Sequence, residues 1–330
     1  MKRVCAYVVC LMSIALALLP TGVRRAGAAD RLSSEITPVS FLSREAEGAQ
    51  VQVDEYIDLD KYELEEVQDG TEPYSSGDEW AWQVLPVGLI YNSYLAGAKE
   101  SRLSGNFINI DDEGLFFDGT LGSRVGLLRY GTMNGFLPEG IQLDAEGSAQ
   151  LRLDIENNVD VRSVDFRAGV PLTFGAGRHR WKLGYYHLSS HLGDEFLLKF
   201  PAYPRLNFVR DVFVVGHTVF WTPRLRFYGE AGWAFNKDVS GPWEFQIGLD
   251  YAPLGPTGIR GAPFFALNGH LREEVDFGGS FTAQAGWAWR SDYSTPLLRA
   301  GVHYLNGKSN QYSFYNQHEE QIGLAMWYDF

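Results

Sequence analysis

Apolar and polar residues alternate with the two-residue period of β-strands over most of the chain beyond Trp80. In the last segment, one strand face carries Ile322, Leu324, Met326, Tyr328 and Phe330. The other face carries small or polar residues and one tryptophan. An apolar face that alternates with a small or polar face is typical of strands that cross a membrane in a barrel.

Counting back from the C-terminus, the same alternation predicts strands over residues 319–330, 297–305, 280–290, 263–273, 242–252, 224–236, 207–221, 180–191, 159–173, 141–154 and 119–131. At least one more strand is expected within residues 84–110. We therefore expect an all-β fold, a transmembrane antiparallel β-barrel of about twelve strands, with ten to fourteen left open. Inward Arg, Glu and Gln side chains should fill the narrow interior of such a barrel.

The N-terminus predicts export. Lys2 and Arg3 precede an apolar run, and small residues follow at residues 26–28, which is the layout of a cleaved secretory signal peptide over residues 1–28. An uncleaved membrane anchor is the alternative, but the apolar run is short for a membrane span. Cys5 and Cys10 both lie within this segment, so the exported chain should lack disulfides and thiol nucleophiles.

Residues 29–79 differ from the rest of the chain in charge. Residues 30–79 contain 15 acidic and 3 basic residues, and they show no clear amphipathic period. We expect this segment to be loosely ordered and periplasmic, in front of a barrel over residues 80–330. Because binding to nucleic acid requires a basic face, this charge excludes nucleic acid as a partner.

The chain is rich in aromatic residues, at 14%, and contains 36 glycines, as expected of an exported β-rich protein. Its terminal Phe330 after alternating apolar residues resembles the signal that the bacterial barrel-assembly machinery recognises. We therefore expect the protein in the outer membrane of a Gram-negative bacterium, in contact with outer-membrane lipid and with that machinery as a partner. The oligomeric state is left open.

The stretch "LGYYHLSSHLGDEF" (residues 183–196) contains the strongest candidate for chemistry. Strand alternation places His187, Ser189 and His191 on one face, together with Trp181, while Ser190 points the other way. Because the charged residues of this strand should face the lumen, His187 and Ser189 should face lipid near one end of the wall. An imidazole two residues from a serine can take the serine's proton and make it a nucleophile.

A serine–histidine site also needs a group that orients the imidazole. The next predicted strand offers Asp211 and Asn207, both on its outward face. Between the two strands, residues 192–206 should form a comparatively long extracellular loop, if the C-terminus is periplasmic.

His187-Leu188-Ser189 resembles the His-x-Ser motif of two families of outer-membrane barrel enzymes, outer-membrane phospholipase A and lipid A 3-O-deacylase. The resemblance implies an ester hydrolase that acts on the acyl chains of phospholipid or lipid A, with Ser189 as nucleophile and His187 as base. It departs from the pattern after the serine, where this chain has Ser190 and His191, and about a dozen residues later, where it has Pro201. Over its whole length the chain resembles an uncharacterised family of Gram-negative exported proteins, which implies no activity.

Two other functions remain open. Asp194 and Glu195 could contribute oxygen ligands to a metal, with Ca²⁺ as the candidate because hard cations prefer carboxylates. The protein could also be a non-enzymatic barrel, either a small channel or a structural protein. The channel alternative predicts inward charges that line an open lumen.

Overall fold

The computed structural model describes residues 79–133 and 137–330. The predicted signal peptide and all of the predicted acidic segment except Glu79 lie outside these residues. The strands are β1 (Trp80–Val84), β2 (Leu103–Ile110), β3 (Gly114–Thr132), β4 (Gly140–Asp154), β5 (Asp160–Ala176), β6 (His179–Leu192), β7 (Phe208–Phe220), β8 (Leu225–Asp238), β9 (Trp243–Tyr251), β10 (Ala262–Arg272), β11 (Gly279–Trp289), β12 (Leu297–Lys308) and β13 (His318–Asp329). The helices are α2 (Asp194–Lys199), η2 (Glu273–Val275) and η3 (Tyr312–Phe314). None of the helices in the described ranges is long and apolar enough to span a bilayer.

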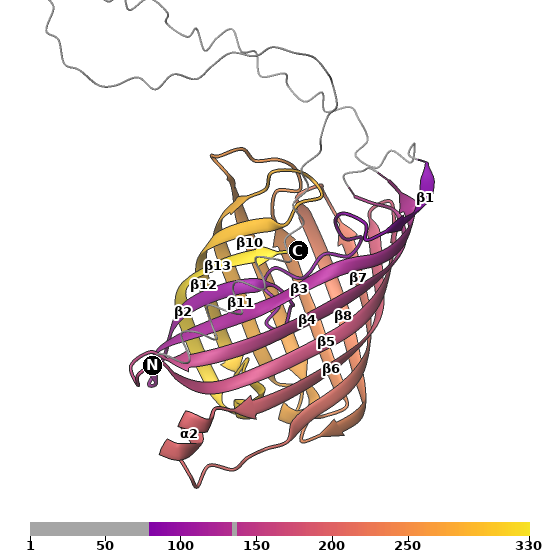
Figure 1. The fold of residues 1–330 in the computed structure, drawn as a ribbon. Coiled ribbons are helices and arrows are strands. Elements are labelled where there is room, and N and C mark those ends of the chain that lie inside the picture. The colour runs from indigo at the N-terminus through magenta and orange to yellow at the C-terminus, as the bar shows by residue number, and fades with distance from the viewer. Residues whose placement is uncertain (1–78, 134–136) are drawn as a thin grey trace, which may run out of the picture. The chain divides into compact units, whose positions relative to one another are not determined.

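Within the described residues, strands β2 to β13 form a closed antiparallel barrel of twelve strands (Figure 1). Each strand pairs with its neighbours in sequence, and β13 pairs with β2 to close the ring. The predicted fold class and strand count are confirmed. The bounds of β3 to β13 also agree with the predicted ranges to within about five residues, because the two-residue period marks these strands directly. The strand expected within residues 84–110 is β2, which occupies only the last part of that range.

The two ends of the barrel are distinct (Figure 1). Phe330 follows β13 at one end, which we call the C-terminal end. The connections that contain α2 and η3 lie at the other, which we call the loop end. Aromatic and aliphatic side chains are exposed on the outward faces of the strands, as at Leu183, Phe213 and Leu324.

The inward faces carry buried charged side chains, as predicted, and the structure shows that many of them form ion pairs. Arg152 donates to Asp118 at 2.7 Å and to Glu319 at 2.9 Å, and Arg299 donates to Asp329 at 2.7 Å. The largest fully buried side chains include Arg152, Arg180, Arg210, Arg272 and Arg299. Pairing of this kind is needed because an isolated charge would be costly to hold in the barrel interior.

The interruption between β1 and β2 was not predicted. β2 pairs with the first half of β3, and β1 pairs with the last residues of β3. β1 and β2 therefore occupy a single strand position in the wall, one after the other. Between them, residues 85–102 leave the wall and enter the lumen, where Tyr91, Tyr94 and Arg102 are buried. We call this stretch the lumen segment.

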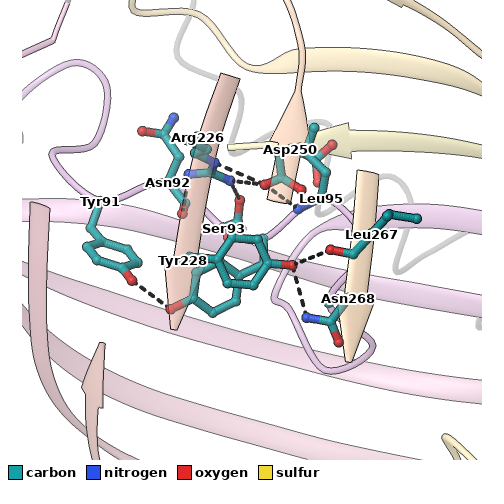
Figure 2. A network of polar contacts seen from close by, with 12 residues as sticks. Tyr91, Asn92, Ser93, Leu95, Arg226, Tyr228, Asp250, Leu267 and Asn268 are labelled. Atoms are coloured by element: carbon teal, nitrogen blue, oxygen red, sulfur yellow. Dashed lines mark hydrogen bonds and ion pairs between the residues drawn. The ribbon is translucent and has the colours of Figure 1, made fainter. Parts of the chain in front are cut away.

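Polar contacts attach the lumen segment to strands around the whole ring. Arg226 of β8 donates to Asp250 of β9 and to the backbone carbonyls of Asn92 and Ser93, and the amide of Leu95 donates to Asp250 (Figure 2). Further contacts reach other strands: Lys99 to Asp165, Ser101 to Ser148 and Arg102 to Asp329. The segment therefore crosses the interior and links opposite walls.

The loop end is also packed with side chains. Phe196 of α2 and Tyr203 contact the ring of Phe314 in η3, at centroid distances of 5.3 and 5.6 Å. The guanidinium of Arg162 lies 4.6 Å from the same ring. The long connection predicted over residues 192–206 is present as residues 193–207, and it contacts η3 through these aromatic side chains.

Candidate functional site

Strand β6 presents the two candidate residues on the outside of the barrel. Its burial alternates strictly, so that Arg180, Lys182, Tyr186 and Ser190 are buried on the inside, whereas His187 and Ser189 are partly exposed on the outside. Ser190 hydrogen-bonds to Asp165 and, at 2.7 Å, to Ser313. The two adjacent serines therefore have different surroundings, and only Ser189 shares a face with His187.

The register between β6 and β7 places Asp211 directly opposite His187. The Nδ1 atom of His187 lies 2.8 Å from Oδ1 of Asp211, and the exposed fractions of the two side chains are 42% and 15%. Asn207, the other candidate orienting residue, instead donates its amide to Asp238 at 3.1 Å. Of the two candidates, Asp211 is therefore the residue that contacts His187.

Two further side chains hold Asp211, and neither was predicted as part of a site. The Tyr185 hydroxyl donates to Oδ1 at 2.7 Å, and the Asn236 amide donates to Oδ2 at 2.6 Å. Tyr185 could have been found from its position, because it lies two residues before His187 on the same face. Asn236 could not, because its place beside Asp211 depends on an irregularity in β8.

The contact with Asp211 selects the tautomer of the imidazole. An ionised carboxylate only accepts hydrogen bonds, so the Nδ1 atom of His187 must carry the proton that Asp211 accepts. In the neutral ring, Nε2 then has a free lone pair. Ser189 lies two residues further along the same strand face, within about 7 Å. The arrangement can therefore activate a hydroxyl as a nucleophile.

The surroundings of the cluster are apolar towards the middle of the wall and mixed towards the loop end, where the exposed Phe166 pairs with Ser189. Leu183, Phe213 and Phe235 are exposed on the side of the cluster nearer the barrel middle. His191 and Asn207 lie on the side nearer the loop end.

Asp194 and Glu195, the predicted metal candidates, lie in the first turn of α2. Over residues 79–133 and 137–330, no group of three or more His, Cys, Asp or Glu side chains is arranged to hold a metal ion.

Several solved structures are similar to this chain. The outer membrane phospholipase of Salmonella typhi, a dimer with bound calcium, is 12% identical, with a TM-score of 0.48 and coverage of 69% of this chain and 90% of that chain. Outer membrane phospholipase A of Escherichia coli is 11% identical, with a TM-score of 0.47 and coverage of 69% and 92%. The KdgM porin is 9% identical, with a TM-score of 0.40 and coverage of 69% and 99%. At these identities the similarity concerns the fold alone.

Comparison of sequences gives the family. No curated protein matches the chain. A family model described as "Protein of unknown function (DUF1207)" matches residues 81–330, which is the whole barrel and most of the chain. The chain therefore belongs to the DUF1207 family, whose function is unknown.

Proposed function

We propose that the protein is an outer-membrane ester hydrolase that removes acyl chains from phospholipid or lipid A. The observation that carries the proposal is the 2.8 Å contact between His187 and Asp211, which face each other on the outside of the barrel. Ser189 is the nucleophile, His187 the general base and Asp211 the group that orients the imidazole.

In this proposal, Nε2 of His187 takes the proton of the Ser189 hydroxyl as the oxygen attacks the carbonyl carbon of the lipid ester. The ester bond breaks, the imidazolium returns the proton to the leaving alcohol, and the acyl chain stays bound to Ser189. Water then attacks this acyl-serine while His187 takes a proton from the water. The bond between Ser189 and the acyl group breaks, the imidazolium returns the proton to the Ser189 oxygen, and a fatty acid is released.

The position of the cluster supports a lipid substrate. Exposed apolar side chains such as Leu183 and Phe213 extend from the cluster towards the middle of the wall. Acyl chains of a membrane lipid can lie against this surface while the ester group sits near the interface. A soluble ester would gain nothing from such a surface.

The channel alternative has less support. It expects inward charges that line an open lumen, whereas the inward charges bind one another and the lumen segment. Residues from β4, β5, β8, β9, β12 and β13 contact that segment. A non-enzymatic structural barrel remains the competing proposal, and it requires no nucleophile on the wall.

The test is acyl release from outer-membrane lipids by the purified protein, compared with Ser189→Ala. Phospholipid and lipid A are offered separately, in mixed micelles. Ser123→Ala is the matched control, because Ser123 is on the outward face of β3, next to the inward Arg124 and away from the cluster. We expect Ser189→Ala to lose activity and Ser123→Ala to keep it. Equal activity of Ser189→Ala and the wild type would remove Ser189 from the mechanism.

A further inference from the structure

We propose that Asn236 and Tyr185 are positioning residues of the Ser189–His187–Asp211 site, and that a β-bulge in β8 exists to place Asn236 there. This inference rests on the proposed hydrolase function. It names two residues that no resemblance implies. Both donate a hydrogen bond to the Asp211 carboxylate, and both act on the site through that group.

The bulge is visible in the pairing of β7 with β8. Asp211 pairs with Asn236, but the next residue of β7, Val212, pairs with Ala234, so Phe235 is an extra residue. Without this extra residue, regular alternation would point the side chain at position 236 into the lumen. The bulge instead leaves Asn236 exposed beside Asp211, with its amide 2.6 Å from Oδ2. Bulges commonly re-aim a side chain next to an active site.

Tyr185 supports the same carboxylate from within β6. Its hydroxyl lies 2.7 Å from Oδ1, the oxygen that also accepts from His187. The ring itself packs among outward aromatic residues, with its centroid 6.2 Å from that of Phe235. The hydroxyl can therefore be removed without removing the ring from the wall.

The physical need for these donors follows from where Asp211 lies. A carboxylate on the outward wall loses much of its hydration, and an unpartnered charge there is costly. Hydrogen bonds from Tyr185, His187 and Asn236 satisfy both oxygens and leave the carboxylate one orientation. Only in that orientation does it accept from Nδ1 of His187 and leave Nε2 free for Ser189.

The first test measures acyl release by Asn236→Ala, Asn236→Asp and Tyr185→Phe. We expect kcat to fall about tenfold in Asn236→Ala and Tyr185→Phe with KM nearly unchanged, because each change removes one hydrogen bond to a charged group. Asn236→Asp fills the same space but cannot donate, so it should be at least as impaired. Full activity of Asn236→Asp would show that Asn236 only fills space, which would overturn the proposal.

A double-mutant cycle decides whether the two residues act through Asp211. In the Asp211→Ala background, adding Asn236→Ala or Tyr185→Phe should have no further effect. An independent loss of the same size in that background would overturn the proposal. Tyr304→Phe is the matched control for Tyr185→Phe, since the Tyr304 hydroxyl donates to Glu320 at 2.9 Å on the exposed faces of β12 and β13.

The second test does not depend on activity. Nitrogen-15 NMR of the detergent-solubilised barrel, labelled at histidine and assigned with His187→Ala, reports which ring nitrogen of His187 carries the proton. We expect the Nδ1–H form in the wild type and a mixture of forms in Asn236→Ala. If no lipid is hydrolysed but this difference is seen, the hydrolase proposal fails while the positioning role stands. Identical His187 spectra in the two proteins would overturn the positioning role.

Discussion

His187 and Asp211 face each other across neighbouring antiparallel strands, and their side chains meet at 2.8 Å on the outside of the barrel. A charged carboxylate at an outward position is rare in a membrane barrel unless it has partners and a function. The Asp211 carboxylate has three hydrogen-bond donors. One of them is the imidazole of His187, which lies two residues from Ser189 on the same strand face. This relationship is the basis of the hydrolase proposal.

Two substitutions of Asp211 separate the effect of its charge from the effect of its hydrogen bond to His187. Asp211→Ala removes the acceptor for Nδ1 of His187, and we expect acyl release to fall by about 100-fold or more. Asp211→Asn keeps an oxygen that can accept from Nδ1, so it should retain more activity than Asp211→Ala. Rates measured on mixed micelles check the order, and Asn207→Ala is a useful comparison because Asn207 bonds to Asp238. An Asp211→Ala protein as active as the wild type would contradict the assigned role.

Removing the lumen segment should convert the barrel into a pore. Val84 and Leu103 pair with Leu128 and Leu121 of β3, so a bridge between them must span about seven residues of strand, or ~23 Å. A Gly/Ser linker of about eight residues in place of residues 85–102 is long enough. We expect no stepwise current from the wild type in planar bilayers and clear steps from the deletion variant.

The control for this deletion is a variant in which the lumen segment is kept but the neighbouring turn between β7 and β8 is changed. This control variant should show no stepwise current in planar bilayers. Wild-type currents as large as those of the deletion variant would contradict a closed lumen and would favour the channel alternative.

Arg152 should be critical for stability. It is fully buried and bridges Asp118 and Glu319, so Arg152→Ala leaves two buried carboxylates without their cation. Removing one partner of such a buried cluster destabilises a protein by roughly 3–5 kcal/mol. Urea unfolding followed by tryptophan fluorescence checks this value. The exposed Arg205→Ala variant should change stability by less than about 0.5 kcal/mol.

The membrane-facing wall can be tested at Leu324, which is 67% exposed near the middle of β13. Leu324→Arg places a charge where lipid should be, and it should reduce the free energy of unfolding in bilayers by about 2–4 kcal/mol. His318→Arg, at the end of the same strand, should cost far less. Equal effects at the two positions would argue against a lipid environment around this wall.

Much of the fold was determined by the sequence itself. The two-residue alternation placed strands β3 to β13, and it put His187 and Ser189 outside and Ser190 inside, as the burial along β6 shows. Alternation is a local property of the backbone, so it can be recognised without knowledge of strand neighbours. The same pattern predicted that Arg, Glu and Gln would fill the lumen.

Three features depended on tertiary structure. The choice of Asp211 over Asn207 required the register across residues 193–207, which alternation within each strand does not set. The place of Asn236 required the bulge at Phe235, which shifts the register between β7 and β8 by one residue. The path of residues 85–102 required the closed ring, because the charged inner walls that bind Arg102, Lys99 and Tyr94 come from strands far apart in the sequence. Local periodicity thus decided which way side chains point, and long-range pairing decided which side chains meet.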